Sequence, residues 1–152
     1  MLNQNFICNK ILNATFVQII IMPTIKTLID KNKKAFDQHF YIESIHLSYL
    51  LITKALKEIT KGERIIVLNN AAKLSDYTKA LKTHYDKTPL FKKKLKKTIY
   101  KQIVEFNAEC KLVTKELKFQ YPEIKLLHTA KKGINIIIML NTTLIKRKSN
   151  KF

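Results

Sequence analysis

Glycine and proline are so scarce in this chain that most folds built from short strands and tight turns are excluded. Its 152 residues include only 2 glycines and 3 prolines. Sandwiches, barrels and glycine-rich phosphate loops need turn residues far more often than this. Long helices do not, and apolar residues recur at helical spacing along most of the chain. The sequence therefore predicts an all-α fold, an antiparallel bundle of four to five helices with short connectors.

Apolar residues at intervals of three to four divide the first half of the chain into three helices. A short helix is expected at about 24–34, with the segment Lys31–Lys34 in solvent. The clearest helix covers about 36–61 and ends at Gly62, because glycine commonly closes a helix. A connector then leads into a helix over about 71–85. These helices precede the densest run of lysines.

Two long helices are predicted in the second half of the chain. Thr88-Pro89 favours a helix start, because proline suits the first helical position, and the pattern continues unbroken to about Phe119. A last helix begins near Pro122. It contains Gly133, which costs about 1 kcal/mol relative to alanine inside a helix. We therefore expect close packing or a kink at that glycine.

The chain divides into an N-terminal extension at 1–21, a helical domain at 22–146 and a basic tail at 147–152. Whether the extension belongs to the native protein is left open, because Met22 offers a second start. The apolar stretch Ile11–Met22 is shorter than the roughly 20 residues that span a bilayer, and no small-residue cleavage site follows it. We therefore expect no membrane span and a cytoplasmic location.

Positive charge dominates the composition and points to a polyanionic partner. Lysine and arginine number 29 against 11 acidic residues, a formal charge of +18. Such a field attracts nucleic acid or an acidic protein. Arg64 and Arg147 are the two arginines, and a lysine surface favours contact with the backbone over readout of bases. A genome rich in A and T is the alternative source of the excess, because lysine, asparagine and isoleucine have AT-rich codons.

The candidate nucleic-acid-binding residues are the lysine run near position 95 and the basic C-terminal end. On one continuous helix, Lys93, Lys97 and Lys101 would share a face. Their mutual repulsion would be relieved by a phosphate backbone, and no acidic residue lies between Asp86 and Glu105. We expect backbone contacts, to RNA rather than DNA, from Lys92, Lys93, Lys94, Lys96, Lys97, Lys101, Lys146, Arg147 and Lys148.

Aromatic residues beside this run have two interpretations. Tyr85, Phe91 and Tyr100 would stack on bases if they were exposed, whereas core positions are favoured for Phe91 and Tyr100.

Histidine and cysteine patterns do not predict a metal site. His39, Glu43 and His46 form a cluster that suits a metal or acid–base site, yet a further ligand is missing and surface histidines are favoured. Cys8 and Cys110 lack metal-ligand spacing and fit free thiols in a reducing cytosol. We expect no cofactor and no metal.

Two segments carry a resemblance to a known family. Phe40–Ile52 resembles the first long helix of HEPN-type proteins, which are small helical domains of toxin–antitoxin and phage-defence systems. The segment from Leu127 to Arg147 resembles the closing helix of some of these families. The resemblance covers about half of the chain. It implies a bundle of four or five helices, often dimeric, with RNA as the usual target.

The residues that make HEPN-type proteins ribonucleases are missing here. Active members carry an arginine, a polar residue and then a histidine near a helix end. The corresponding segment, around Phe106–Leu117, holds Asn107 and Lys111 but neither arginine nor histidine. The resemblance therefore implies a catalytically silent member, and a degenerate ribonuclease is the remaining enzymatic possibility.

These observations predict a non-enzymatic helical module that binds nucleic-acid backbone through its lysines. The alternative is a protein-interaction or assembly subunit, such as a silent HEPN-like partner of a toxin. In that case, an apolar belt near the C-terminus would form a homodimer through Ile134, Ile137 and Ile138.

Overall fold

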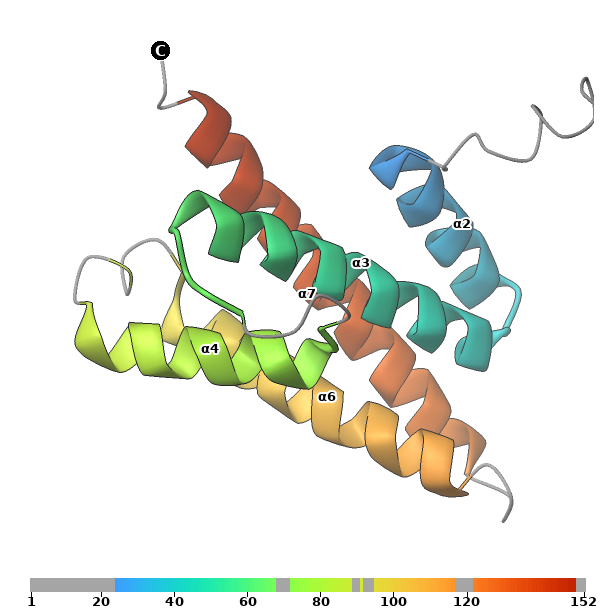
Figure 1. Cartoon of the computed structure of the whole chain (residues 1–152). Coiled ribbons are helices and arrows are strands. Elements are labelled where there is room, and N and C mark those ends of the chain that lie inside the picture. The colour runs from blue at the N-terminus through green and yellow to red at the C-terminus, as the bar shows by residue number, and fades with distance from the viewer. Residues whose placement is uncertain (1–23, 68–71, 89–90, 92–94, 117–121, 150–152) are drawn as a thin grey trace, which may run out of the picture.

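The computed structural model describes residues 24–67, 72–88, 91, 95–116 and 122–149, with side chains as far as residue 143 (Figure 1). The described residues contain five helices and no strand, so the predicted all-α fold is confirmed. None of these helices is both long and apolar enough to cross a membrane. The helices are α2 (Ile25–Asp37), α3 (Tyr41–Gly62), α4 (Leu74–Lys87), α6 (Lys97–Glu116) and α7 (Glu123–Ser149).

The central element of the bundle is α3, which packs most extensively against α7 and also contacts α2 and α4. In Figure 1, α3 lies across α7, with α2 on one side of this pair and α4 and α6 on the other. Because α6 packs against both α4 and α7, its remaining face is left to solvent. The arrangement therefore separates α6 from α2.

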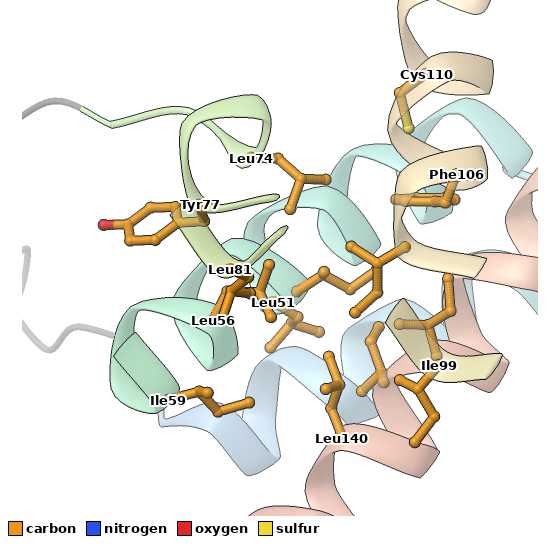
Figure 2. Close-up of a cluster of buried hydrophobic side chains, with 14 of the residues drawn as sticks. Leu51, Leu56, Ile59, Leu74, Tyr77, Leu81, Ile99, Phe106, Cys110 and Leu140 are labelled. Atoms are coloured by element: carbon orange, nitrogen blue, oxygen red, sulfur yellow. The ribbon is translucent and has the colours of Figure 1, made fainter. Parts of the chain in front are cut away.

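The core is a single apolar cluster to which α3, α4, α6 and α7 contribute buried side chains (Figure 2), and Leu28, Ile29 and Phe36 of α2 pack against it. On α4, Leu74, Tyr77 and Leu81, whose helical spacing predicts inward positions, are buried. Burial of each large aliphatic side chain stabilises the fold by roughly 1.5–3 kcal/mol. Helical spacing also predicts an inward face on the fourth helix. Leu117 of that face lies outside the described residues, and its other members are buried, namely Phe91, Leu95, Ile99, Ile103, Phe106, Cys110 and Val113.

The predicted unbroken helix from 88 to about 119 is wrong. Leu95 and Lys96 are not helical, and α6 begins only at Lys97. Repulsion between lysines three and four residues apart opposes a continuous helix through this run. The buried side chains of Phe91 and Leu95 anchor the connection to the core. The helix that carries Lys97 and Lys101 therefore does not continue back through Leu95.

The boundary between the first two described helices also differs from the prediction. Phe36 belongs to α2, and α3 starts at Tyr41 rather than near 36. The chain reverses through His39, whose backbone is left-handed with φ 63°. At the other end, α3 closes at Gly62 as predicted, but the left-handed residue that follows is Arg64, with φ 55°.

A buried polar cluster joins α2 to α3 where the sequence predicted a solvated segment. Asn32, within the predicted solvated segment, is only 2% exposed. Its Nδ2 donates to Ser48 Oγ at 2.8 Å, and Ser44 Oγ donates to Asn32 Oδ1 at 2.7 Å. The Asn32 amide thus acts as a hydrogen-bond donor to one serine and an acceptor from the other, which offsets the unfavourable burial of these polar groups.

The apolar belt of α7 is turned differently from the predicted dimer face. Ile137 is 7% exposed and belongs to the core, so its assignment to a dimer interface is wrong. Ile138 is 51% exposed and Ile134 is half-buried. The consecutive apolar residues surround the helix, and packing against α3 and α6 selects which of them are buried. Gly133 packs closely against α3, as one of the two predicted outcomes required.

Candidate nucleic-acid interface

The exposed face of α6 carries a line of residues that we call the outer stripe. Its members recur at alternating intervals of four and three, which places them on one side of a helix with 3.6 residues per turn. All six are exposed, so the line is not covered by α4 or α7. The outer stripe consists of Lys97, Lys101, Val104, Ala108, Lys111 and Lys115.

Most of the stripe's positive charge is not neutralised within the described fold. Lys101 Nζ lies 3.9 Å from Glu105 Oε1, and these side chains are 78% and 45% exposed. An ion pair in water is weak and leaves the lysine available to another anion. Among the described residues, no carboxylate lies within 4 Å of the other three stripe lysines, Lys97, Lys111 and Lys115.

Contacts with α4 hold one edge of α6. The Tyr100 hydroxyl donates to the Thr78 carbonyl at 3.2 Å, and its ring stacks on Tyr85 with centroids 5.7 Å apart. Burial, with a smaller contribution from the charge of Asp86, raises the pKa of Tyr100. The core interpretation is confirmed for Phe91, which is buried, while Tyr100 is half-buried in its stack on the buried Tyr85.

Contacts with α7 hold the opposite edge of α6. Glu109 accepts a hydrogen bond from Thr129 Oγ1 at 3.0 Å and pairs with Lys132. Lys132 Nζ also lies 3.7 Å from Glu105 Oε2, and its side chain is 18% exposed. Lys132 of α7 therefore pairs with both carboxylates and offsets one of their two negative charges, which limits how far they cancel the stripe.

Only part of the predicted interface falls within the described residues. Lys96 precedes α6 and is exposed, and Lys97 and Lys101 lie on the outer stripe. Lys92, Lys93 and Lys94 lie outside the described residues. Lys146, Arg147 and Lys148 belong to the last turns of α7, but their side chains lie outside the description.

Two stripe lysines were missed by the sequence analysis. Lys111 and Lys115 continue the spacing set by Lys97 and Lys101, which is a signal present in the sequence. The predicted interface follows the densest run of charge, and these two residues stand apart from that run.

A second candidate site is an open pocket of about 720 Å³ where the α2–α3 turn meets the start of α7. The sequence cluster of His39, Glu43 and His46 lines it, joined by Glu123 of α7. The ring of His39 is held at Nδ1 by the Tyr41 hydroxyl, 2.6 Å away. The histidine cluster is therefore exposed at a pocket and is not isolated from carboxylates.

The chemistry available at this pocket is limited by its geometry. Among the described residues, no three His, Cys, Asp or Glu side chains are placed to hold a metal ion. Glu43 pairs with Lys31 at 3.5 Å. Phe40 and Ile42, 56% and 47% exposed, give the pocket an apolar rim. The combination suits a protein or peptide contact better than metal chemistry.

The buried thiol of Cys110 is not a candidate nucleophile. Burial, and to a lesser degree the charge of Glu109, raises the pKa of Cys110 to about 12. A thiol in that state stays protonated at neutral pH, whereas the thiolate is the reactive form.

No family model, curated protein or solved structure matches this chain. The HEPN-type resemblance remains a prediction from the sequence. The segment around Phe106–Leu117, where active members of that family carry their motif, lies on α6 as far as Glu116. There Asn107 is buried, and its Oδ1 has no hydrogen-bond partner among the described residues, whereas Lys111 is exposed.

Proposed function

We propose that this chain is a non-enzymatic basic helical module that binds the phosphate backbone of nucleic acid, with RNA preferred. The observation that carries the proposal is the outer stripe of α6, in which four exposed lysines align and three have no carboxylate within 4 Å among the described residues. Phosphates would neutralise this line and release condensed counterions. A reducing cytoplasm suits the buried free thiol of Cys110.

Binding through the outer stripe is expected to be independent of base sequence. The stripe contains no arginine, asparagine or glutamine, which are the side chains that usually read base edges. Lysine acts as a point charge toward phosphate. The HEPN-type resemblance of Phe40–Ile52, whose family usually targets RNA, favours RNA over DNA.

A pair of variants matched in charge tests the proposal. The stripe variant carries Lys→Gln at 97, 101, 111 and 115. The control carries Lys→Gln at the exposed positions 26, 33, 34 and 57, which lie on α2 and α3. Both lower the formal charge of +18 by four. Any difference between them therefore reports where the charge lies rather than how much there is.

Fluorescence anisotropy of a labelled RNA, titrated at salt concentrations from about 50 to about 200 mM, gives the readout. We expect the slope of log affinity against log salt to fall by about three in the stripe variant and by less than about one in the control. Equal losses in the two variants, or no binding by the wild type at low salt, would contradict the proposal.

A second candidate function is that of a protein-interaction or assembly subunit, such as a silent HEPN-like partner in a toxin–antitoxin or phage-defence system. The exposed side chains of Phe40 and Ile42 beside the 720 Å³ pocket favour it. The partner would be a second copy or an acidic protein. Because Ile137 is buried, Ile138→Lys and Phe40→Ser are the informative variants. Light scattering that shows a monomer throughout would contradict self-assembly.

A further inference from the structure

The outer stripe has charged ends and a neutral middle. Lys97 and Lys101 form one pair, Lys111 and Lys115 form the other, and Val104 and Ala108 lie between them. At 1.5 Å per residue the stripe is about 27 Å long, and about 15 Å of it separates the two pairs. Val104 is 41% exposed, and Leu112, which follows Lys111 in the chain, is 47% exposed. A ligand that fits this pattern offers two lines of anions with a weakly polar surface between them.

The helix that carries the stripe packs against α4 and α7. Tyr100 ties α6 to α4 on one side, and Glu109 ties it to α7 on the other. Lys82 on α4 and Lys131 on α7 are also exposed. A helix flanked in this way cannot enter a deep groove. Its ligand must present a shallow one.

The described residues provide no aromatic platform on this face for unpaired bases. Tyr85 is 8% exposed and Phe91 is 1% exposed, while the ring of Tyr100 is engaged by Tyr85. Proteins that bind single strands depend on exposed aromatics, each worth about 1–3 kcal/mol per stacked base. The face therefore suits a duplex, whose bases are already stacked on each other.

We infer that the outer stripe is a binding surface for double-stranded RNA. In this arrangement α6 lies across the shallow minor groove, and each lysine pair contacts one of the two bordering backbones. The inference rests on the proposed function and names its ligand. A-form RNA has a wide, shallow minor groove lined by 2′-hydroxyls. Val104 and Ala108 lie over the groove floor, and the lysine pairs reach the phosphates on either side. Short side chains in the middle let the helix approach closely.

B-form DNA fits this face poorly. Its minor groove is about 6 Å wide, too narrow for a helix roughly 10 Å across, and its major groove is about 8.5 Å deep. The flanking helices would meet the DNA backbone before α6 reached the floor of that groove. Contact with DNA would then use one lysine pair at a time and bind more weakly.

Three labelled ligands of one mixed sequence test the inference with the full chain. They are an RNA duplex of about 20 base pairs, the matching DNA duplex and the single RNA strand, each titrated at about 150 mM salt. We expect the RNA duplex to bind roughly tenfold more tightly than either other ligand. The stripe variant should abolish that preference, whereas the α2–α3 control should retain it.

A tryptophan in the middle of the stripe provides a second readout. Ala108→Trp places a bulky ring between the lysine pairs, and Leu50→Trp adds the same ring at an exposed position on α3. We expect Ala108→Trp to weaken duplex RNA binding roughly fivefold while strengthening single-strand binding, because it supplies a stacking platform. Leu50→Trp should change neither. Circular dichroism confirms that both variants are helical.

The outcomes distinguish the duplex RNA inference from the proposed function. Equal affinity for the three ligands, with the loss confined to the stripe variant, would overturn the duplex RNA inference and leave the proposed function standing. A preference for the single strand would do the same. Loss of binding to all ligands in both charge variants, or a wild type that binds none of the ligands, would overturn both the inference and the proposed function. If Ala108→Trp leaves duplex binding unchanged, the placement of Ala108 over the groove floor would be contradicted.

Discussion

A Cβ atom added to Gly133 of α7 would lie 2.6 Å from Ser48 Cβ of α3. It would also lie 2.9 Å from Cε2 of Phe106 on α6. Three helices therefore meet at a point that accepts only a hydrogen atom. Because Ser48 also bonds Asn32 of α2, this contact is next to the buried polar cluster. The approach of α7 to α3 sets how both helices pack on α6.

Gly133→Ala should destabilise the fold, although alanine favours helix by about 1 kcal/mol over glycine. The new methyl group overlaps Ser48 and the ring of Phe106, and overpacking of this kind costs about 1–3 kcal/mol. We expect a net loss of about 1 kcal/mol or more, measured as a lower urea midpoint.

Gly62→Ala is the matched control, because nothing lies within 4 Å of a Cβ at that position and its φ is not positive. There the helix preference should act alone, so we expect no loss of stability and a gain of up to about 1 kcal/mol. A Gly133→Ala protein as stable as Gly62→Ala would mean that α3 and α7 do not approach so closely.

Asn32→Ala should destabilise the fold by about 2 kcal/mol, because it leaves the hydroxyls of Ser44 and Ser48 buried without their partner. Asn135→Ala, an exposed change on α7, should alter the unfolding free energy by less than about 0.5 kcal/mol. Urea unfolding of both variants checks this.

Replacing all three side chains of the buried polar cluster should lower the unfolding free energy by less than the three single replacements together. In the triple variant with alanine at 32, 44 and 48, no buried hydroxyl is left without a partner. We expect its loss of stability to be smaller than the sum of the three single losses. Strict additivity would show that the three side chains act independently.

Periodicity predicted the core because burial depends on which side of a helix a residue occupies. Ile99, Ile103, Phe106 and Cys110 are buried as their spacing requires. The same rule concealed the break before Lys97, since Phe91 and Leu95 continue the spacing across it. An apolar pattern marks inward positions but does not distinguish one helix from two that pack on the same core.

The sites were less predictable, because they depend on contacts between distant segments. Asn32 looks like part of a solvated lysine segment until Ser44 and Ser48 of α3 are placed beside it. The pocket at His39 includes Glu123, which only the position of α7 reveals. Charge density located one end of the outer stripe, whereas its other end required knowledge of which face of α6 stays exposed.

Cys110 should resist thiol reagents in the native protein. In a Cys8→Ser background it is the remaining thiol, and burial keeps it protonated with a pKa of about 12. We expect labelling by a maleimide at neutral pH to be slow in buffer and fast in denaturant. Rapid native labelling would show that α6 opens locally.

The same pKa gives stability a dependence on alkaline pH. The folded thiol has a pKa of about 12 against an ordinary value of 9.0, so between these pH values the folded state holds a proton that the unfolded state has lost. The stabilisation is therefore fully present below pH 9.0 and is lost as pH rises toward 12. Unfolding free energies of Cys110→Ala should fall less steeply across this range than those of the wild type.

Lys132 should matter more for stability than Lys101, although both pair with Glu105. Lys132 is 18% exposed and also pairs with Glu109, whose side chain is 25% exposed, whereas Lys101 is 78% exposed. Removing Lys132 leaves Glu109 without its partner cation and leaves Glu105 with only the exposed Lys101. We expect Lys132→Ala to lower the unfolding free energy by about 1–2 kcal/mol and Lys101→Ala by less than about 0.5 kcal/mol.

A double-mutant cycle separates the ion pair from the packing of the Lys132 stem. If the pair carries the effect, adding Glu109→Ala to Lys132→Ala should recover part of the lost stability. Lys132→Ala should also weaken RNA binding at low salt, although Lys132 lies off the outer stripe, because Glu105 and Glu109 then oppose the neighbouring lysines. The double variant should bind more tightly than Lys132→Ala alone. If neither variant changes RNA binding, the charges of Glu105 and Glu109 at the α7 edge do not influence binding by the stripe.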